Sequence, residues 1–391
     1  MKTEKIKILI TGGAGFIGRH VSCALISLGH QVRILDNLST QVHFSSTEPG
    51  WIRTNSIDFI RGSVTKKEDV IMALDGVTHV IHLAAETGTG QSMYEINHYF
   101  NVNVQGTALL LDLLQNHQCS RNVRSVVVAS SRAVYGEGSY HCHDHGLIHP
   151  AYRTKESMEL GNFEPICPFC SLPINTVETD EKAPFNPSSI YGLTKQLQEQ
   201  SVLMVAKNLR LNAFALRYQN VYGPGQSLKN PYTGILAVLS NLARQNHAIE
   251  VYEDGLESRD FVYIDDVVNA TIKSLFYEGN CIAPLNIGSG EPTPVIEVAK
   301  RINQFFEGKG EIKVTGNFRV GDIRHNRADI TLANNILGYV PSLKFEVGLN
   351  NFLKWVENEP ENEVDGVLRS TRELESRGLF GKPSNRNKRN G

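Results

Sequence analysis

The feature that most constrains the fold is a glycine-rich segment, TGGAGFIG, between an apolar run and a helical pattern. The run Lys5–Ile10 predicts a buried strand, and Gly12, Gly15 and Gly18 follow it closely. Apolar residues then recur at helical spacing until Gly29, which predicts a helix. A strand joined to a helix by a tight glycine turn is typical of an α/β protein with a parallel sheet.

Further apolar runs follow the same plan. Predicted strands lie at Gln31–Leu35, Thr78–Leu83, Ser125–Ala129 and Leu211–Leu216, and predicted helices lie at Asn101–Asn116 and Ser189–Asn208. Continuous apolar strands that alternate with helices indicate a parallel sheet covered on both faces. We therefore expect a doubly wound parallel sheet of the α/β class.

The alternation is interrupted once and then becomes less regular. We expect a sheet-forming domain over residues 1–220, interrupted over 137–186 by an insertion that is rich in Cys and His. Residues 221–355 suit a smaller lobe, parts of which return to the first domain. Its predicted helices lie near Ile235–Gln245, Asp265–Phe276 and Val295–Phe306. The polar tail over 356–391 is expected to be a frayed terminus.

Composition excludes several classes of protein. The chain has 391 residues and a net charge of -2, so no basic excess is available to attract nucleic acid or an acidic membrane. No apolar run approaches the ~18–20 residues of a membrane span, and the N-terminus does not resemble a signal peptide. Six Cys in so long a chain do not make a disulfide scaffold, so we expect a cytoplasmic protein.

The glycine loop and Asp36 together predict a nucleotide cofactor. Glycines let backbone N–H groups approach a pyrophosphate at the positive end of the helix. Asp36 ends the second predicted strand, where its carboxylate can accept both ribose hydroxyls of NAD and would repel the additional phosphate of NADP. Arg33 is near but, as a strand residue, can point elsewhere. These residues favour NAD.

Ser131, Tyr191 and Lys195 form the second constellation. Tyr191 and Lys195 are four residues apart and therefore lie on one face of the predicted helix. An ammonium and an oxidised nicotinamide both favour a phenolate, which can take a proton from a sugar hydroxyl. Ser131 ends a predicted strand, where its hydroxyl can bind the reacting oxygen. Each residue alone is commonplace, but together with a dinucleotide loop they indicate hydride transfer at a carbinol.

The chain resembles extended short-chain dehydrogenase/reductases of the nucleotide-sugar epimerase/dehydratase type from residue 5 to about 350, outside the insertion. The strings that carry the resemblance are TGGAGFIG, LDNLS, HLAA, NVQGT, SSRAVYG, YGLTK, RYQNVYGP, SRDFVYIDD and GDIRHNRADI. It implies an NAD-binding Rossmann domain, a nucleotide-sugar lobe, a homodimer, and Ser131, Tyr191 and Lys195 as the catalytic triad. The implied NAD contacts are Gly12, Gly15, Phe16, Ile17, Gly18, Asp36, Asn37, Ser63, Val64, Leu83, Ala84, Ala85, Tyr191, Lys195 and Tyr218.

Two positions narrow the reaction. Dehydratases of this family carry Asp-Glu after the hydroxyl residue, whereas this chain has Arg132 and Ala133, so dehydration is disfavoured. Oxidation at C4, rotation of the keto sugar and re-reduction would give a 4-epimerase. Net oxidation by a dehydrogenase, reduction by a 4-ketoreductase, and a non-catalytic NAD-binding protein remain open.

The substrate follows from the resemblance alone. The chain looks most like dTDP-L-rhamnose 4-epimerases, also called 6-deoxy-L-talose 4-dehydrogenases, in three strings: RYQNVYGPGQSLKNPYTGI, YEDGLESRDF and FRVGDIRHNRADI. This resemblance implies a dTDP-6-deoxyhexose as the substrate. A UDP-sugar 4-epimerase is the alternative. Asn220, Arg259 and Arg324 match residues that hold the nucleotide diphosphate or ribose, and Ser131 and Arg132 are expected beside the sugar. Simple ion pairs with Glu257, Asp260 or Asp322 are the other interpretation of the two later arginines.

The insertion offers four metal ligands. Cys142 and His145 form one chelating step, and Cys167 and Cys170 form another 22 residues beyond His145. Two such steps predict a tetrahedral zinc ribbon, and zinc held by them would be structural. A disordered loop with incidental Cys, or a ribbon without metal, is the alternative. We also expect that the ribbon lies at the mouth of the substrate site, as a lid or an interface.

Overall fold

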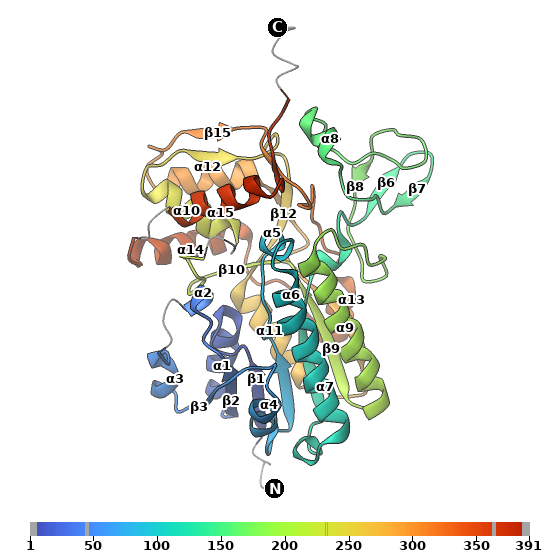
Figure 1. Cartoon of the computed structure of the whole chain (residues 1–391), viewed down its shortest axis with the longest axis vertical. Coiled ribbons are helices and arrows are strands. Elements are labelled where there is room, and N and C mark those ends of the chain that lie inside the picture. The colour runs from blue at the N-terminus through green and yellow to red at the C-terminus, as the bar shows by residue number, and fades with distance from the viewer. Residues whose placement is uncertain (1–5, 44–46, 231, 233, 362–364, 385–391) are drawn as a thin grey trace.

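The protein is seen here as a computed structural model, in which residues 6–43, 47–230, 232, 234–361 and 365–384 are described (Figure 1). Lys5, which begins the first predicted strand, and the last residues of the tail, 385–391, lie outside the described residues.

A seven-stranded sheet forms the centre of the molecule. Its order is β13-β9-β5-β4-β1-β2-β3, and every neighbouring pair is parallel. The strands are β1 (Lys7–Thr11), β2 (Gln31–Asp36), β3 (Asp58–Arg61), β4 (His79–His82), β5 (Ser125–Ser131), β9 (Asn212–Tyr218) and β13 (Ile282–Ile287). The predicted doubly wound α/β fold is confirmed. The order of the strands reverses between β1 and β4, because β2 and β3 extend the sheet on one side and the later strands extend it on the other. Ligands of such sheets bind at that point, beyond the carboxyl ends of the strands.

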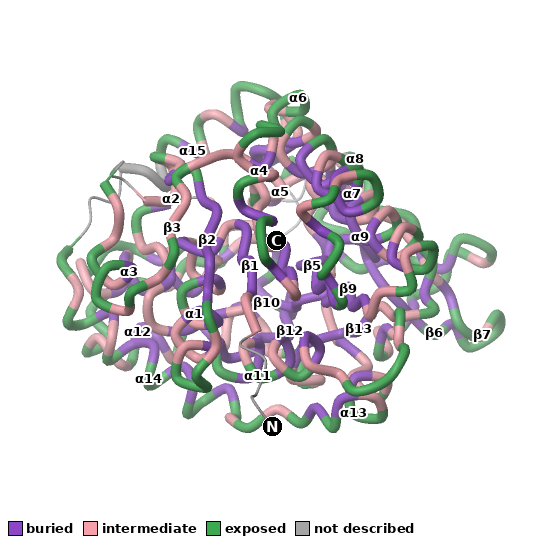
Figure 2. Tube along the Cα trace, turned by 90° about the horizontal axis from the view of Figure 1, so that it is seen from below, coloured by how far each residue is buried: buried purple, intermediate pink, exposed green. Residues whose placement is uncertain are grey.

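Helices cover both faces of the sheet because side chains alternate along each strand. On β1, Ile8 and Ile10 are buried toward one face and Leu9 toward the other. The first face is covered by α1 (Phe16–Ser27), α11 (Ile264–Leu275) and α13 (Thr331–Leu337). The second is covered by α4 (Lys67–Leu74), α7 (Gly106–Asn116) and α9 (Ile190–Leu209). Figure 2 shows the buried strands between these two layers.

The helix predicted over 101–116 differs from expectation at its start. A π-helix, Phe100–Gln105, precedes α7. Within it the buried Asn103 accepts a hydrogen bond from the Glu86 backbone N–H at 2.7 Å and donates to the Thr194 hydroxyl at 3.0 Å. These bonds join the loop after β4 to α9. Widened turns of this kind are frequent near functional sites.

The smaller lobe has its own sheets and apolar core. Its strands are β10 (Asn220–Tyr222), β12 (Ser258–Tyr263) and β14 (Pro292–Pro294) in one sheet, and β11 (Ile249–Val251) with β15 (Ile312–Val314) in another. Its helices are α10 (Ile235–Arg244), α12 (Val295–Phe305) and α14 (Phe345–Asn358). At its centre, the rings of Phe261 and Phe345 stack with centroids 4.9 Å apart. Because β13 and α11 pack in the first domain, this part of the chain contributes to both.

The insertion projects from the body of the molecule beside α9 (Figure 1). It forms an antiparallel sheet of β6 (Tyr140–Cys142), β7 (Gly146–Ile148) and β8 (Asn175–Thr176), and one short helix, α8 (Lys155–Glu159). Its core is small and consists mainly of Tyr140, Ile148, Ile174 and two of the cysteines.

The expectation of a frayed C-terminal tail is wrong for residues 365–384. Helix α15 (Asp365–Ser376) is followed by β17 (Phe380–Gly381), which pairs with β16 (Phe318–Arg319). Leu374 and Phe380 are buried, and the Glu373 carboxylate accepts hydrogen bonds from the Tyr94 and Tyr232 hydroxyls at 3.0 and 2.7 Å. The tail thus fastens to both lobes.

One buried ion pair fixes α9 to the sheet. The Arg217 guanidinium on β9 donates to both carboxylate oxygens of Glu199 on α9, at 2.5 and 3.1 Å. Glu199 also accepts a hydrogen bond of 2.6 Å from the Ser130 hydroxyl on β5. Both ion-pair partners are almost fully buried. This single carboxylate therefore joins one helix and two strands.

No helix in the described ranges is both long enough and apolar enough to cross a membrane.

Glu199→Gln should lower the free energy of unfolding by about 3–5 kcal/mol, because it leaves the buried Arg217 charge without its partner. Urea denaturation measures the change. Gln200→Ala, at the exposed next position of α9, is the control and should change the free energy little. A loss no larger than that of the control would show that the ion pair does not stabilise the helix.

Candidate active site

A cavity of about 400 Å³ lies along the carboxyl ends of the central strands. Its walls come from the glycine loop, the end of β2, the loop after β4, the end of β5 and the start of α9. The lining residues include every cofactor contact implied by the sequence: Gly12, Gly15, Phe16, Ile17, Gly18, Asp36, Asn37, Ser63, Val64, Leu83, Ala84, Ala85, Tyr191, Lys195 and Tyr218. The structure therefore places all of them around one space.

The glycine loop leaves no room for side chains. Gly12 has a φ of +68°, and a Cβ there would lie 2.7 Å from the Ala84 backbone nitrogen. A Cβ on Gly18 would lie 2.6 Å from the Gly13 Cα. Only glycine permits this close approach of turn, helix and neighbouring strand. The loop and the first residues of α1 line the cavity, so the positive end of this helix lies beside it, where an anionic group is stabilised.

Asp36 and Arg33 have the geometry that favours NAD over NADP. Asp36 is buried at the end of β2, and its carboxylate accepts hydrogen bonds from the backbone N–H groups of Ala14 at 3.0 Å and Leu38 at 2.8 Å. Arg33 points away from the cavity, since its guanidinium donates to the Asp58 carboxylate at 2.7 Å and to backbone carbonyls at the C-terminal end of α4. No arginine from this strand is therefore placed to bind a ribose 2′-phosphate.

Ser131, Tyr191 and Lys195 meet at the inner end of this cavity. The Ser131 side chain hydrogen-bonds the Tyr191 phenol. The Lys195 ammonium lies 6.0 Å from the centre of the Tyr191 ring and donates to the Ala129 carbonyl at 2.9 Å. Ser189 caps α9 by accepting a hydrogen bond from the Gly192 N–H, which fixes the turn that carries Tyr191. The predicted triad is thus assembled from β5 and α9.

The ionisation of these groups follows from their burial. Burial raises the pKa of the Tyr191 phenol, while the Ser131 hydrogen bond and the Arg132 charge act in the opposite direction. Burial lowers the pKa of Lys195 to about 7. The charge of Arg132 is therefore a contribution in favour of the Tyr191 phenolate that the sequence did not suggest.

A second cavity of about 890 Å³ opens from the first one toward the smaller lobe. Tyr191 lines both cavities, so its phenol stands between them. Polar residues of the second cavity include the predicted substrate residues Arg132, Asn220 and Arg259. Apolar residues of α10 and β11, Ile235, Val238, Leu239, Leu242 and Val251, form one wall. An elongated ligand with an anionic part and a flat apolar part suits this space.

Two arginines in this cavity have donors available for a ligand. Arg259 is oriented by the Asp322 carboxylate at 3.1 Å and by backbone carbonyls. One terminal nitrogen of Arg132, Nη1, is fully enclosed and has no hydrogen-bond partner within the described part of the chain. Burial and the neighbouring Arg259 lower the pKa of Arg132 to about 10, so it remains charged at neutral pH. A phosphate or another anionic group would satisfy this pair.

Arg324 is the predicted substrate residue that the structure places elsewhere. It is fully buried, does not line either cavity, and its guanidinium donates to Glu164, Glu253 and Asp254 at 2.6–3.0 Å. These carboxylates occupy its donors, so Arg324 is not placed to bind a nucleotide phosphate. The simple ion-pair alternative also named the wrong partner, Asp322.

Arg319 takes the place expected for Arg324. It lines the second cavity, and its guanidinium carbon lies 5.1 Å from the centre of the Tyr252 ring. Its Nε is enclosed without a hydrogen-bond partner among the described residues. Sequence reasoning missed Arg319, although it stands five residues before Arg324 in the sequence FRVGDIR. The apolar Phe318 before it was the available signal. Successive side chains of a strand point to opposite faces, so a buried Phe318 places Arg319 on the other face of β16.

Glu257 is a second residue that sequence reasoning did not place in the site. It lines the second cavity, is buried, and its Oε2 has no hydrogen-bond partner within the described ranges. Burial raises the pKa of Glu257 to about 7, although the charge of Arg259 opposes the shift. Such a carboxyl group can bind a hydroxyl of a ligand.

The four predicted metal ligands come together in the insertion. The ligand atoms of Cys142, His145, Cys167 and Cys170 all lie within 4.8 Å of one another. The Cys142 sulfur is 3.5 Å from His145 Nδ1 and 3.7 Å from the Cys170 sulfur, and the Cys167 sulfur is 3.6 Å from the same nitrogen. A tetrahedral zinc ion with bonds of about 2.0–2.3 Å would separate its ligand atoms by roughly 3.5–3.8 Å. The donor set therefore fits zinc.

The expected position of the insertion at the substrate mouth is not observed. None of residues 137–186, all of which are described, lines either cavity. The C-terminal helix α15 instead contributes Thr371 to the second cavity. The insertion contacts the wall behind that cavity, through Arg153 and Glu164.

Comparisons with known proteins agree with this geometry. A model of the NAD dependent epimerase/dehydratase family matches residues 8–288. The chain is 37% identical over 355 residues to dTDP-L-rhamnose 4-epimerase of Burkholderia thailandensis, which covers 90% of this chain and 95% of that protein.

Solved structures show the same fold. UDP-glucose 4-epimerase of Thermotoga maritima with UDP-glucose has a TM-score of 0.72 at 27% identity, and MoeE5 in complex with UDP-glucuronic acid and NAD has 0.71 at 28%. Each match covers 90% of this chain and 99% of the other. With its parallel sheet, glycine loop and Ser-Tyr-Lys site, the chain belongs to the NAD-dependent epimerase/dehydratase family.

Proposed function

We propose that this protein is an NAD-dependent nucleotide-sugar 4-epimerase that acts on a dTDP-6-deoxyhexose, interconverting sugars such as dTDP-L-rhamnose and dTDP-6-deoxy-L-talose. The observation that carries the proposal is the position of Tyr191 between a dinucleotide-shaped cavity and a larger cavity lined by arginines. A base between the two cavities can reach a hydroxyl of the sugar while the nucleotide part of the substrate lies in the second cavity.

The residues of the chain supply the proton chemistry. NAD, when bound, supplies a reversible hydride acceptor. The Tyr191 phenolate takes the proton from the C4 hydroxyl, and the Ser131 hydroxyl orients the C4 oxygen. The second cavity, about 890 Å³, leaves room for the 4-keto sugar to turn about its diphosphate. Tyr191 then returns the proton to the C4 oxygen after reduction from the opposite face.

The diphosphate and nucleoside would be held in the second cavity. Arg132, Arg259 and Arg319 present charged donors to the second cavity, and Asn220 lies beside them. The similarity to dTDP-L-rhamnose 4-epimerase supports the deoxynucleotide. A UDP-sugar 4-epimerase is the second candidate, since the chain also resembles a UDP-glucose 4-epimerase solved with UDP-glucose.

Two further parts of the proposal concern the state of the enzyme. We propose that the protein forms a homodimer through α9, the helix that carries Tyr191. Sedimentation velocity would test this by measuring the mass of the protein in solution. We also propose a cytoplasmic location, to be tested by fractionation of the cells that make the protein. The six cysteines lie within the described residues and are all free, which suits a reducing compartment.

We also propose that Cys142, His145, Cys167 and Cys170 bind a structural zinc ion. The Cys167 sulfur accepts backbone hydrogen bonds from Phe169 and Cys170, which favour the thiolate form that binds metal. All four ligand positions come from the protein, so no position is left open for a substrate.

The purified protein should interconvert the two C4 epimers without added cofactor. Tyr191→Phe should lower kcat at least roughly 10³-fold because the base is lost. NMR of the product sugars measures turnover, and native mass spectrometry reports bound NAD. Tyr152→Phe, at an exposed tyrosine of the insertion, is the control. Stoichiometric NADH would indicate a dehydrogenase instead, and turnover by Tyr191→Phe would exclude the proposed base.

Ser131→Ala should move the rising limb of the kcat–pH profile to higher pH. The lost hydrogen bond lowers the pKa of Tyr191, so its removal raises that pKa and reduces the phenolate at neutral pH. We expect kcat at neutral pH to fall roughly 10–100-fold and to recover in part as the pH rises. Ser130→Ala, whose hydroxyl binds Glu199, should leave the limb in place. An unshifted limb in Ser131→Ala would contradict the assignment.

The protein should contain zinc as purified. Cys167→Ser and Cys170→Ser should each remove the metal and lower the melting temperature by several degrees, because binding stabilises only the folded state. Elemental analysis and calorimetry measure both effects. Cys119→Ser, far from the cluster, is the matched control. Unchanged metal content in the first two variants would exclude the site.

A further inference from the structure

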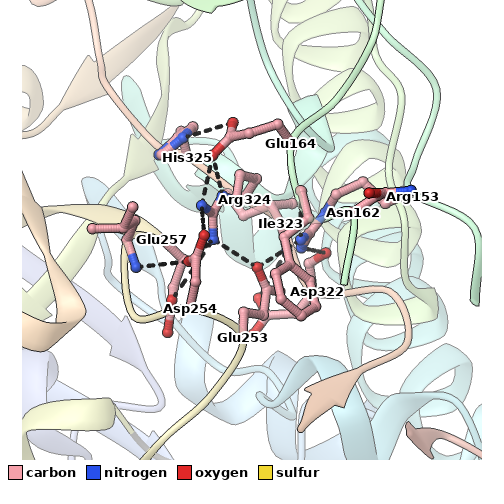
Figure 3. A network of polar contacts seen from close by, with 12 residues as sticks. Arg153, Asn162, Glu164, Glu253, Asp254, Glu257, Asp322, Ile323, Arg324 and His325 are labelled. Atoms are coloured by element: carbon pink, nitrogen blue, oxygen red, sulfur yellow. Dashed lines mark hydrogen bonds and ion pairs between the residues drawn. The ribbon is translucent and has the colours of Figure 1, made fainter. Parts of the chain in front are cut away.

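The insertion is joined to the wall of the second cavity by a buried network of charges (Figure 3). Its centre is the Glu253 carboxylate, whose Oε2 accepts hydrogen bonds from Arg153 Nη1 at 2.7 Å and Arg324 Nη1 at 3.0 Å. Arg153 belongs to the insertion, whereas Glu253 and Arg324 belong to the smaller lobe. All three side chains are almost fully buried.

Arg153 makes four hydrogen bonds, two within the insertion and two to the smaller lobe. Its guanidinium donates to Glu137 at 3.0 Å and to the Phe163 carbonyl at 3.1 Å, both within the insertion. It also donates to Glu253 and, at 3.0 Å, to the Asp322 backbone carbonyl. A planar guanidinium with five donors is suited to fix several segments in one geometry.

The two lobe residues that Arg153 holds both line the second cavity. Glu253 follows Tyr252, the residue against which Arg319 stacks. Asp322 carries the carboxylate that orients Arg259, at 3.1 Å. Arg153 itself lines neither cavity. Its bonds thus determine the position of the groups that orient two of the arginines expected to bind the nucleotide.

Glu164 connects the same network to the Cys/His cluster. It lies three residues before Cys167, and its carboxylate accepts hydrogen bonds from the Arg324 guanidinium at 2.7 Å and lies 3.3 Å from His325. His325 is in turn 2.9 Å from the Ser258 hydroxyl, next to Arg259. The folded ribbon therefore supports this wall at two places, Arg153 and Glu164.

We propose that the insertion is a buttress of the nucleotide site and that Arg153 is its positioning residue. Through Glu253 and Asp322 it keeps Arg319 and Arg259 in the geometry that binds the nucleotide diphosphate. The inference rests on the proposed function, since it assumes that this cavity receives a nucleotide diphosphate. It assigns the insertion a role in substrate affinity rather than in hydride transfer.

The test compares Arg153→Met with Arg153→Lys in the full-length protein. Arg153→Met should weaken binding of dTDP roughly 10–100-fold and raise KM similarly, because misplaced binding groups cost affinity. We expect kcat to change much less, and bound NAD and metal content to stay unchanged. Arg153→Lys keeps a charged donor and should recover part of the affinity. Isothermal titration with dTDP, and with UDP in parallel, measures binding.

The matched control is Glu178→Gln. Glu178 lies in the insertion and pairs with Arg327 of the lobe at 2.6 Å, but neither residue lines a cavity. Glu178→Gln removes a contact between the insertion and the smaller lobe that does not involve a residue of either cavity. The affinity for dTDP should therefore remain that of the unmodified protein.

A second variant tests the proposal if Arg153→Met does not fold. Glu164→Gln changes a half-exposed residue and should weaken dTDP binding several-fold, with faster hydrogen exchange over residues 252–260. A folded Arg153→Met with unchanged affinity, or an effect of Glu178→Gln equal to that of Arg153→Met, would overturn the buttress. If the unmodified protein binds neither dTDP nor UDP, the proposed function fails, and the buttress fails with it. Tight dTDP binding unaffected by the variants would refute the buttress alone.

Discussion

The geometry of the active site depends on the buried pair between Arg217 and Glu199. Glu199 is the only acid on the inner face of α9 within the described part of that helix, and it binds β9 through Arg217 and β5 through Ser130. Lys195 stands about one turn and Tyr191 about two turns before Glu199 on the same helix. The pair therefore sets the distance between the phenol and the end of β5. Removal of one partner would leave a charge in an apolar interior, which is why such an arrangement tolerates little change.

The arginines in and around the second cavity differ in how many of their donors are already bound. Arg324 is surrounded by carboxylates and acts within the protein, whereas Arg132 and Arg319 each have an enclosed nitrogen without a partner among the described residues. A buried donor without a partner is costly. A bound anion would remove this cost, so we expect an anionic ligand at Arg132 and Arg319, which line the second cavity, rather than at Arg324. Arg259 is intermediate, since Asp322 orients it without occupying all its donors.

Local patterns in the sequence were sufficient for the sheet class and five of its seven strands, the glycine loop, the Ser-Tyr-Lys site and the Cys/His cluster, whereas β3 and β13 were not predicted. Each depends on residues close in the chain or on strand ends that a parallel sheet brings together. The role of Arg324 was not predictable, because its carboxylate partners at Glu164 and Glu253 are far away in sequence. The C-terminal segment was missed for a similar reason. Strand β17 has only two residues, and it is held by pairing with β16, which is distant in the sequence. The preceding helix, α15, is held through Glu373 by hydrogen bonds from tyrosines in distant loops.

The pairing of β17 with β16 has a consequence for the biogenesis of the enzyme. Arg319 lies directly opposite Phe380, so the strand that presents this arginine is paired by residues that come much later in the sequence. Synthesis proceeds from the N-terminus, and domains fold in that order. The cavity beside the glycine loop, whose lining ends at Gly234, can therefore form before the strand that presents Arg319 is paired. A product of a premature stop codon shortly before Phe380 would retain that cavity and leave Arg319 on an unpaired strand.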